Sequence, residues 1–236
     1  MIQDTERLFV QALALGLDPA WRRLPERERA EDAAELIRAM ERGTDGVATF
    51  TYSMIGLRPG AELMLWRQAG SLDLLEEAAA HVLKAGAGRS FHVVHSLLGI
   101  IQPSQYVKRP TEQEQSLFSG ERSRYLVVYP FTKSTEWYLL GQSARQGIMN
   151  EHMRVGHEYP EIRQLLAYSF GIDDQDFLVA YETDDLVQFG SLVRDLRGTE
   201  SRRSTVRDTP ILTCVHRPLA EIMGLLGAGV SAAVSA

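Results

Sequence analysis

Cysteine is almost absent from the sequence, which contains only Cys214 among its 236 residues. A lone thiol forms neither an intrachain disulfide nor a thiolate metal cluster, so we expect a reducing compartment and assign the cytoplasm by default. The sequence also lacks an apolar run of roughly 18 residues, which a membrane-spanning helix needs. Its first ten residues, MIQDTERLFV, mix charges with short apolar runs, which is not the pattern of a signal peptide.

Positive charge is scarce as well. Lysine and arginine total 25 against 31 aspartates and glutamates, for a formal net charge of −6. Because no basic stripe is present to neutralise phosphates, nucleic acid is not expected as the main partner. The G-x-S-x-G, P-loop and Rossmann glycine patterns are also missing. The composition that remains, 44% hydrophobic and 24% charged residues, is typical of a soluble globular protein with a sizeable core.

Hydrophobic periodicity predicts the same order of elements in both halves of the chain, namely strand, helix, strand, strand, helix, strand. This order is typical of a ferredoxin-like fold. In the first half we predict strands over Leu8–Gly16, Val47–Leu57, Ala61–Gln68 and Phe91–Gln102, and helices over Ala20–Arg42 and Leu72–Leu83. In the second half we predict strands over Arg124–Phe131, Ile162–Phe170, Asp176–Glu182 and Pro210–His216, and helices over Ser143–Val155 and Asp185–Arg197.

The two halves also match in sequence at a constant offset of 116 residues. The matching pairs are Trp21 with Trp137, Leu24 with Leu140, Arg29 with Arg145, and Tyr52-Ser53 with Tyr168-Ser169. We therefore predict an α+β fold in which two tandem ferredoxin-like repeats form a dimeric-type α+β barrel within one chain. The predicted boundaries are 1–103 for the first repeat, 104–123 for a connector, 124–223 for the second repeat and 224–236 for a tail.

The repeats differ at positions where polar chemistry replaces plain core. Three positions are leucine in the first half and polar in the second: Leu13 against Tyr129, Leu17 against Lys133, and Leu36 against His152. A buried polar group is costly unless it has a partner or takes part in chemistry. This asymmetry predicts that a functional site lies in the second repeat.

Metal and hydrolase chemistry find less support. His152 and His157 are five residues apart, which on a helix separates them by about 140° rather than placing them on one face. His92 and His95 are three apart on a predicted strand, so they should face opposite sides. The pair Asp173-Asp174 follows a glycine and is explained by a turn between strands. A single histidine near a helix end remains, and a haem iron can use one imidazole in this way.

The combined pattern Y-P-F-x-K, W-Y-L-L, E-H, Y-S-F-G-I-D-D-Q-D-F, L-R-x-T-E and D-T-P resembles the chlorite dismutase superfamily, and within it the coprohaem decarboxylases. The resemblance covers residues 104–216 well and the first hundred residues mainly in architecture. It implies two ferredoxin-like repeats with haem bound only in the second. It also implies a homo-oligomer, a pentamer in much of the family.

The resemblance assigns roles to individual residues of this chain. His152 matches the proximal iron ligand and Glu200 the carboxylate that accepts that histidine's second N–H. Tyr129 matches the tyrosine that decarboxylases use as a radical relay, and Lys133 the neighbouring lysine that engages a propionate. Tyr106 and Arg197 match propionate-side positions more loosely, and Trp137 is expected beside the cofactor.

The residue on the distal side of the haem has two candidates. Gln164 occupies the position seen in some decarboxylases, whereas a shift by one residue would place Arg163 there, and chlorite dismutases need an arginine at this site. Strand alternation allows only one of the two to face the pocket, and we favour Gln164. The connector contains no histidine, so it does not supply the distal histidine that some relatives use.

The function that follows is peroxide-dependent oxidative decarboxylation of two propionates of iron coproporphyrin III, which is both substrate and cofactor, to give haem b. The expected partners are coprohaem and hydrogen peroxide. Three alternatives stay open: a chlorite-degrading or peroxidase-like haem enzyme, a haem carrier or sensor without enzymatic activity, and a haem-free barrel.

Overall fold

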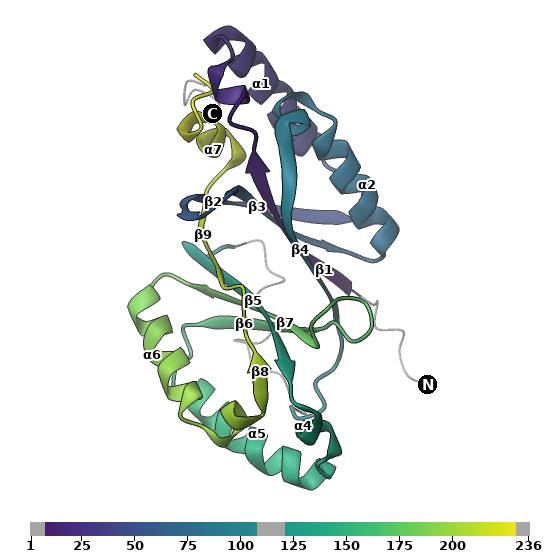
Figure 1. Cartoon of the computed structure of the whole chain (residues 1–236), viewed down its shortest axis with the longest axis vertical. Helices are drawn as coiled ribbons and strands as arrows, with labels where there is room; N and C mark the ends of the chain where they lie inside the picture. Colours follow the sequence, from purple (N-terminus) through teal and green to yellow (C-terminus); the bar gives the residue numbers. More distant parts are fainter. Residues whose placement is uncertain (1–7, 108–120, 230–236) are drawn as a thin grey trace. The chain divides into compact units, whose positions relative to one another are not determined.

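The computed structural model describes residues 8–107 and 121–229, arranged in two compact units. Unit 1 contains Met1–Ile100 together with Cys214–Ala236, and unit 2 contains Ile101–Thr213. Residues 108–120 of the expected connector and 230–236 of the expected tail lie outside the described part. Helices and strands occur in both units (Figure 1), so the predicted α+β class is confirmed. In the described part of the chain, no helix is long and apolar enough to cross a membrane.

Unit 1 contains a sheet in which the strands lie in the order β4-β1-β3-β2-β9. Its elements are β1 (Leu8–Leu17), η1 (Trp21–Arg23), α1 (Glu26–Arg42), β2 (Val47–Arg58), β3 (Ala61–Ala69), α2 (Leu72–Leu83), η2 (Gly86–Ser90), β4 (Phe91–Ile101), β9 (Leu212–His216) and α7 (Leu219–Leu225). The helix predicted from Ala20 begins only at Glu26, because a 3-10 turn and Pro25 precede it.

The core of unit 1 lies between this sheet and its helices. Leu13 on β1 pairs in register with Leu65 on β3, and both side chains are buried against Leu36 of α1 and Ile222 of α7. Alternate residues of each strand face this core, as the period of a strand requires. Leu17, like Leu13 and Leu36, is buried here, so all three leucines that align with polar residues of the second half are core residues.

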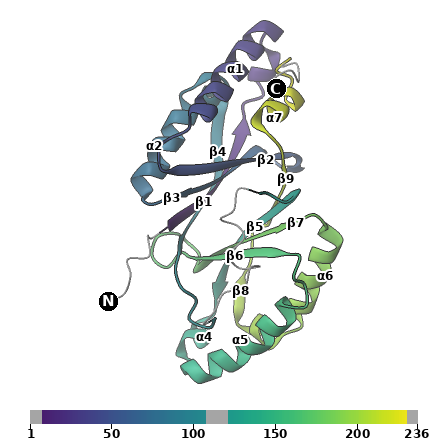
Figure 2. The same ribbon diagram turned by 180° about the vertical axis from the view of Figure 1, so that it is seen from behind.

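Unit 2 contains a sheet in the order β6-β7-β5-β8. Its elements are β5 (Tyr125–Lys133), α4 (Thr135–Leu139), α5 (Gln142–Gly156), β6 (Arg163–Tyr168), β7 (Phe177–Thr183), α6 (Leu186–Arg197), η4 (Glu200–Ser204) and β8 (Thr205–Arg207). Helices α5 and α6 lie side by side (Figure 1 and Figure 2). Asp185 caps α6, since its carboxylate accepts hydrogen bonds from the amides of Val187 and Gln188.

The buried core of unit 2 is smaller than that of unit 1. Its fully buried members are Ile162, Val179, Tyr181 and Leu192, and α5 contributes no buried side chain. Partly buried residues such as Phe189 pack against this cluster. Side chains therefore leave part of the space between α5, α6 and the sheet unfilled.

The last predicted strand of the second half extends from unit 2 into unit 1. The strand predicted over Pro210–His216 forms as β9, and its end pairs with β2 of unit 1, where Tyr52 lies opposite His216. Before it, the three residues of β8 pair with the end of β5 in unit 2. Alternation of buried residues along 212–216 identifies a strand, but it carries no information about which neighbour that strand pairs with.

Glu182 on β7 is 0% exposed and lies among arginines of the same unit. Its carboxylate is 2.9 Å from Nη2 of Arg163 and 3.5 Å from Nη1 of Arg122. Arg163 also donates to the hydroxyl of Ser123. A buried charge of this kind stabilises the fold only while its partners remain in place.

We expect Glu182→Gln to destabilise the chain by about 3 kcal/mol, because it leaves buried guanidinium charge without a carboxylate. The control is Glu158→Gln, which breaks an exposed pair with Arg154 within α5 and should change stability by less than about 1 kcal/mol. Urea unfolding of both variants measures the difference. Equal effects would show that the buried Glu182 pair contributes no more to stability than an exposed one.

Candidate active site

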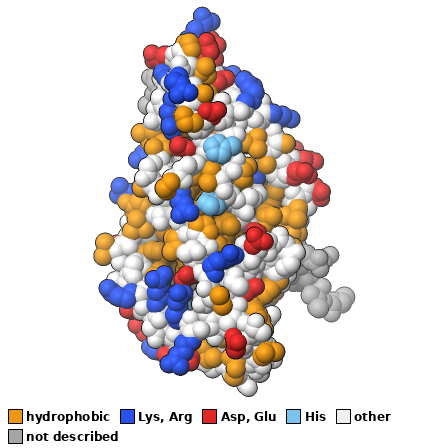
Figure 3. Space-filling view, viewed as in Figure 1, with side chains coloured by type: hydrophobic (Ala, Val, Ile, Leu, Met, Phe, Trp, Pro, Cys, Tyr) orange, Lys and Arg blue, Asp and Glu red, His pale blue; other side chains and the backbone are white. Residues whose placement is uncertain are grey.

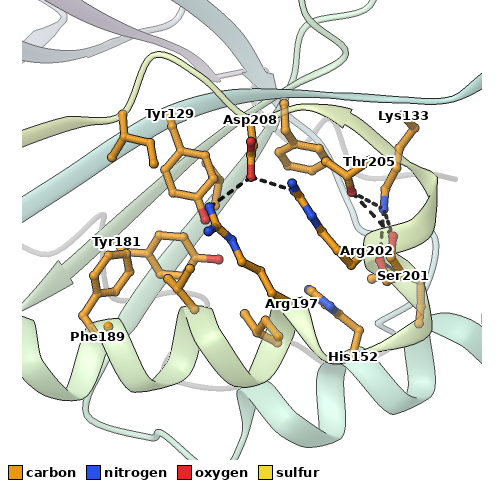
Figure 4. A pocket seen from close by; sticks show the side chains of 17 residues that line it. Tyr129, Lys133, His152, Tyr181, Phe189, Arg197, Ser201, Arg202, Thr205 and Asp208 are labelled. Atoms are coloured by element: carbon orange, nitrogen blue, oxygen red, sulfur yellow. Dashed lines mark hydrogen bonds and ion pairs between the residues drawn. The ribbon is translucent and has the colours of Figure 1, made fainter.

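A cavity of about 280 Å³ lies in unit 2 between the sheet and helices α5 and α6 (Figure 4). Most of its wall is apolar, and the apolar residues include Phe131, Met149, Val179, Phe189, Leu196 and Ile211. Four of the eight residues predicted from the sequence also line it: Tyr129, Lys133, His152 and Arg197. The cavity therefore brings together polar groups from β5, α5 and α6 that are far apart in the sequence.

Lys133 ends β5 and is held by oxygen acceptors. Its Nζ donates to the carbonyl and hydroxyl of Ser201, both at 3.0 Å, and to the hydroxyl of Thr205 at 3.2 Å. It also lies 4.7 Å from the ring centroid of Trp137. Burial, together with the charge of Arg202, lowers the pKa of Lys133 to about 8. Trp137 does not line the cavity; it is 2% exposed and packs behind the lysine.

His152 lies on α5 with Nδ1 3.4 Å from the hydroxyl of Thr199. That hydroxyl donates its one hydrogen to the carbonyl of Leu196 at 2.7 Å, so toward the histidine it acts as an acceptor. The imidazole proton is therefore assigned to Nδ1, which leaves the lone pair on Nε2. Burial, reinforced by the charge of Lys133, lowers the pKa of His152 to about 4 against the opposing effect of Glu151. At neutral pH the side chain is uncharged, the form that binds a metal ion.

The carboxylate of Glu200 does not lie beside Nδ1 of His152, where the family resemblance placed it. Its carboxylate lies 3.4 Å from Nε of Arg203, and its amide donates to the carboxylate of Glu151 at 3.0 Å. The neighbour of His152 Nδ1 is Thr199, one residue earlier. The chain between α6 and η4 thus presents a hydroxyl to the imidazole and turns the carboxylate outward.

Tyr129 forms a pair with Tyr181, a residue that the sequence analysis did not single out. The two rings stack with centroids 6.0 Å apart and an angle of 24° between their planes. Burial raises the pKa of Tyr129 well above its ordinary value, and the charge of Tyr181 and the hydrogen bond to it act in the same direction. Tyr181 lies two residues beyond Val179, which is directly opposite Tyr129. Strand alternation would have placed both phenols on one face.

Arg202 and Asp208 were also not predicted from the sequence. Together with Arg197 they form a charged group in the cavity wall. Asp208 is 2.7 Å from Nη1 of Arg202 and 3.5 Å from Nη2 of Arg197 (Figure 4). Lys and Arg side chains also gather on the α6 side of unit 2 in the space-filling view (Figure 3). Three cations and one carboxylate line the cavity, which favours an anionic ligand.

Gln164 and Arg163 face opposite sides of the sheet. Gln164 lies directly opposite Tyr181 and Arg163 directly opposite Glu182, and residues paired in this way share a face. Gln164 is therefore on the face that carries the cavity, although it does not line it. Arg163 is on the other face, in its ion pair with Glu182.

Tyr106 lies beside the site rather than in it. Its ring contacts Trp137 edge to face with centroids 6.4 Å apart, and its carbonyl accepts a hydrogen bond from Gln146 on α5. The pair Asp173-Asp174 lies in a turn, in which the carboxylate of Asp173 accepts a hydrogen bond from the amide of Asp174. Within the described ranges, no group of three or more His, Cys, Asp and Glu side chains is arranged to hold a metal ion.

Lys133→Met should stabilise the ligand-free chain at pH 7 by about 1–3 kcal/mol, because the native lysine carries its charge in a poorly solvated place. Because folding lowers the pKa of Lys133, the destabilisation caused by its buried charge is full below about pH 8. It fades as the pH rises from there toward the pKa of a lysine in the unfolded chain. The advantage of the variant over the native chain should therefore shrink above pH 8. Urea unfolding from pH 6 to pH 10 measures it, and a constant difference would contradict the assignment.

Comparisons with known proteins identify the family of the chain. The family described as chlorite dismutase matches residues 27–217. A protein named coproheme decarboxylase, from Mycolicibacterium smegmatis, is 31% identical over 163 residues, which are 69% of this chain and 70% of that protein. The solved structure of chlorite dismutase from Candidatus Nitrospira defluvii in complex with imidazole has a TM-score of 0.84 and 28% identity, over 93% of this chain and 95% of that one. A mutant of the same enzyme gives the same values. The chain therefore belongs to the chlorite dismutase family.

Proposed function

We propose that the chain is a coprohaem decarboxylase, which uses hydrogen peroxide to convert iron coproporphyrin III to haem b by removing carboxyl groups from two propionates. One observation carries the proposal: Tyr129, Lys133 and His152 open into a single apolar cavity of unit 2. The relative named coproheme decarboxylase supports the same reaction. A macrocycle with charged side arms needs apolar walls for its faces and cations for its carboxylates, and this cavity offers both.

His152 is the residue that would hold the iron. Its Nε2 carries the lone pair because Thr199 fixes the proton on Nδ1. A hydrogen bond on the second nitrogen orients a metal-bound imidazole and adjusts its basicity. Thr199 would accept the second N–H of His152, the role that the family resemblance gave to Glu200. A hydroxyl acceptor raises the basicity of the imidazole less than a carboxylate does.

Lys133 and the arginines would bind the propionates. Lys133 already points its ammonium at neutral oxygen acceptors, so a carboxylate that approaches it needs to displace no counter-ion. Arg202 and Arg197 are different, because Asp208 already pairs with both. A ligand carboxylate would share or replace Asp208 there. Ion pairs formed in this sheltered wall are stronger than those at the surface.

Tyr129 is the group that we assign to pass an oxidising equivalent to a propionate. Its phenol is buried, neutral and hydrogen-bonded to Tyr181. When bound, the iron porphyrin supplies the peroxide-driven oxidation. Each cycle removes one β-hydrogen and one CO2 from a propionate, leaves a vinyl group, and transfers two electrons to peroxide, which becomes water.

Chlorite degradation is the second candidate, since the similar solved structures are chlorite dismutases. The sequence comparison ties that activity to an arginine on the distal side. Arg163, the arginine in question, lies on the opposite face of the sheet from the cavity and pairs with Glu182. This placement favours decarboxylation.

The proposal extends to the architecture and setting of the chain. Units 1 and 2 both show the order strand, helix, strand, strand, helix, strand, and this supports two ferredoxin-like repeats of one α+β barrel. By resemblance to the family we propose a homo-oligomer, a pentamer, that acts in the cytoplasm.

Tyr129→Phe should retain porphyrin binding and lose conversion. One hydroxyl hydrogen bond contributes about 1 kcal/mol, so the Kd for iron coproporphyrin III should change by no more than about fivefold. Mass spectrometry after addition of peroxide should show two successive losses of CO2 with the native chain and none with the variant. The control is Tyr125→Phe, on the same strand but outside the cavity. Binding without conversion by the native chain would reduce the proposal to a haem carrier, and unchanged turnover by Tyr129→Phe would remove the tyrosine from the mechanism.

His152→Ala should change the absorption spectrum of the bound ferric porphyrin, because the iron loses its protein ligand. Added imidazole should restore the native spectrum by occupying the space that the side chain leaves. His157→Ala is the matched control, since His157 is exposed at the end of α5 and should leave the spectrum unaltered. An unaltered spectrum for His152→Ala would rule this ligand out.

A further inference from the structure

Unit 1 contains a buried arginine, Arg67, that has no counter-ion in the part of the chain that the structure describes. Arg67, on β3, is 0% exposed. Its Nη2 donates to Oε1 of Gln11, while its Nε and Nη1 have no hydrogen-bond partner among the described residues. Of the residues that the structure describes, no carboxylate forms an ion pair with Arg67, and burial is the cause of its perturbed pKa.

The neighbours of Arg67 across the sheet are neutral. Gln11 on β1 and Thr49 on β2 lie directly opposite it. The amide of Gln11 is fixed in orientation, since its Nε2 donates to the hydroxyl of Ser96 at 2.8 Å and its oxygen accepts from the arginine. An amide dipole satisfies one N–H but does not neutralise a whole positive charge.

A small cavity of about 20 Å³ adjoins the guanidinium, between the sheet and helices α1 and α2. Its polar wall consists of Arg67, Thr44, Thr49 and His81. The rest is mainly apolar, from α1 and α2: Ala39, Met40, Ala78 and Val82. A space of this size holds one water-sized occupant, and it is too small for sulfate, phosphate or an organic carboxylate.

The charge balance selects between the possible occupants. Burial lowers the pKa of Arg67 to about 10, so the group remains cationic at neutral pH. A cation in an apolar wall is strongly unfavourable without a counter-charge. A water molecule would accept one N–H but leave the charge in place, whereas a monovalent anion would accept from one of the two unpaired nitrogens and also neutralise the charge.

We propose that this cavity is a binding site for one halide-sized monovalent anion, for which chloride is the physiological ligand, and that Arg67 is its principal ligand. The site lies wholly within unit 1 and does not depend on the porphyrin chemistry proposed for unit 2. Its effect is to stabilise the packing of α1 and α2 on the sheet in a chloride-dependent way.

Thermal unfolding at constant ionic strength tests the proposal, with chloride exchanged for gluconate, which is too large for the cavity. The Tm of the native chain should rise by about 2–4 °C or more as chloride replaces gluconate. Arg67→Met removes the charge and fits the apolar wall, so its Tm should not respond. Arg27→Met, which removes an exposed arginine of the same unit, should respond like the native chain. A native Tm that does not respond would overturn the proposal.

A second measurement does not require Arg67→Met to fold. Crystals of the native chain grown in sodium bromide should show an anomalous peak within hydrogen-bond distance of Nε or Nη1 of Arg67. A peak there supports the site. Density for water without an anomalous signal would show that the cavity is hydrated and that the arginine is tolerated without an anion.

Discussion

The site in unit 2 depends on keeping one imidazole uncharged and correctly oriented inside an apolar cavity. His152 meets both conditions because burial lowers its pKa to about 4 and because Thr199 accepts its Nδ1 proton. Thr199 can act only in this sense, since its own proton goes to Leu196. The position of Thr199, between α6 and η4, therefore determines that the lone pair of His152 is on Nε2. In the proposed function, the cations of the cavity wall would bind propionates and Tyr129 would act on one only if that lone pair held an iron.

The two units show what this arrangement requires. In unit 1 the positions equivalent to Tyr129, Lys133 and His152 are leucines packed in a continuous core. In unit 2 the same positions line a cavity, and the fully buried apolar cluster shrinks to a few residues. The order of strands and helices is the same in both units, but unit 2 has less buried apolar packing and a cavity in its place. A bound macrocycle would restore the missing contacts, so ligand and fold are expected to stabilise each other.

Much of this was accessible from the sequence. Periodicity identified the strands and helices, and the leucine-to-polar differences pointed to the unit that contains the cavity. The family resemblance favoured Gln164 over Arg163, and Gln164 is the one that lies on the cavity face. Local pattern could not reveal partners that only the fold brings together. Tyr181, Arg202 and Asp208 come from β7, η4 and the segment after β8. The pairing of β9 with β2 was missed for the same reason. Glu200 was misplaced because a one-residue difference in the turn after α6 decides whether a hydroxyl or a carboxylate meets the imidazole.

The most direct test of the account is a crystal structure of the chain with iron coproporphyrin III bound. The account predicts the macrocycle in the cavity of unit 2, the iron bonded to Nε2 of His152, and a propionate within reach of both Tyr129 and Lys133. A porphyrin bound elsewhere, an iron held by another residue, or a Tyr129 separated from every propionate would contradict it.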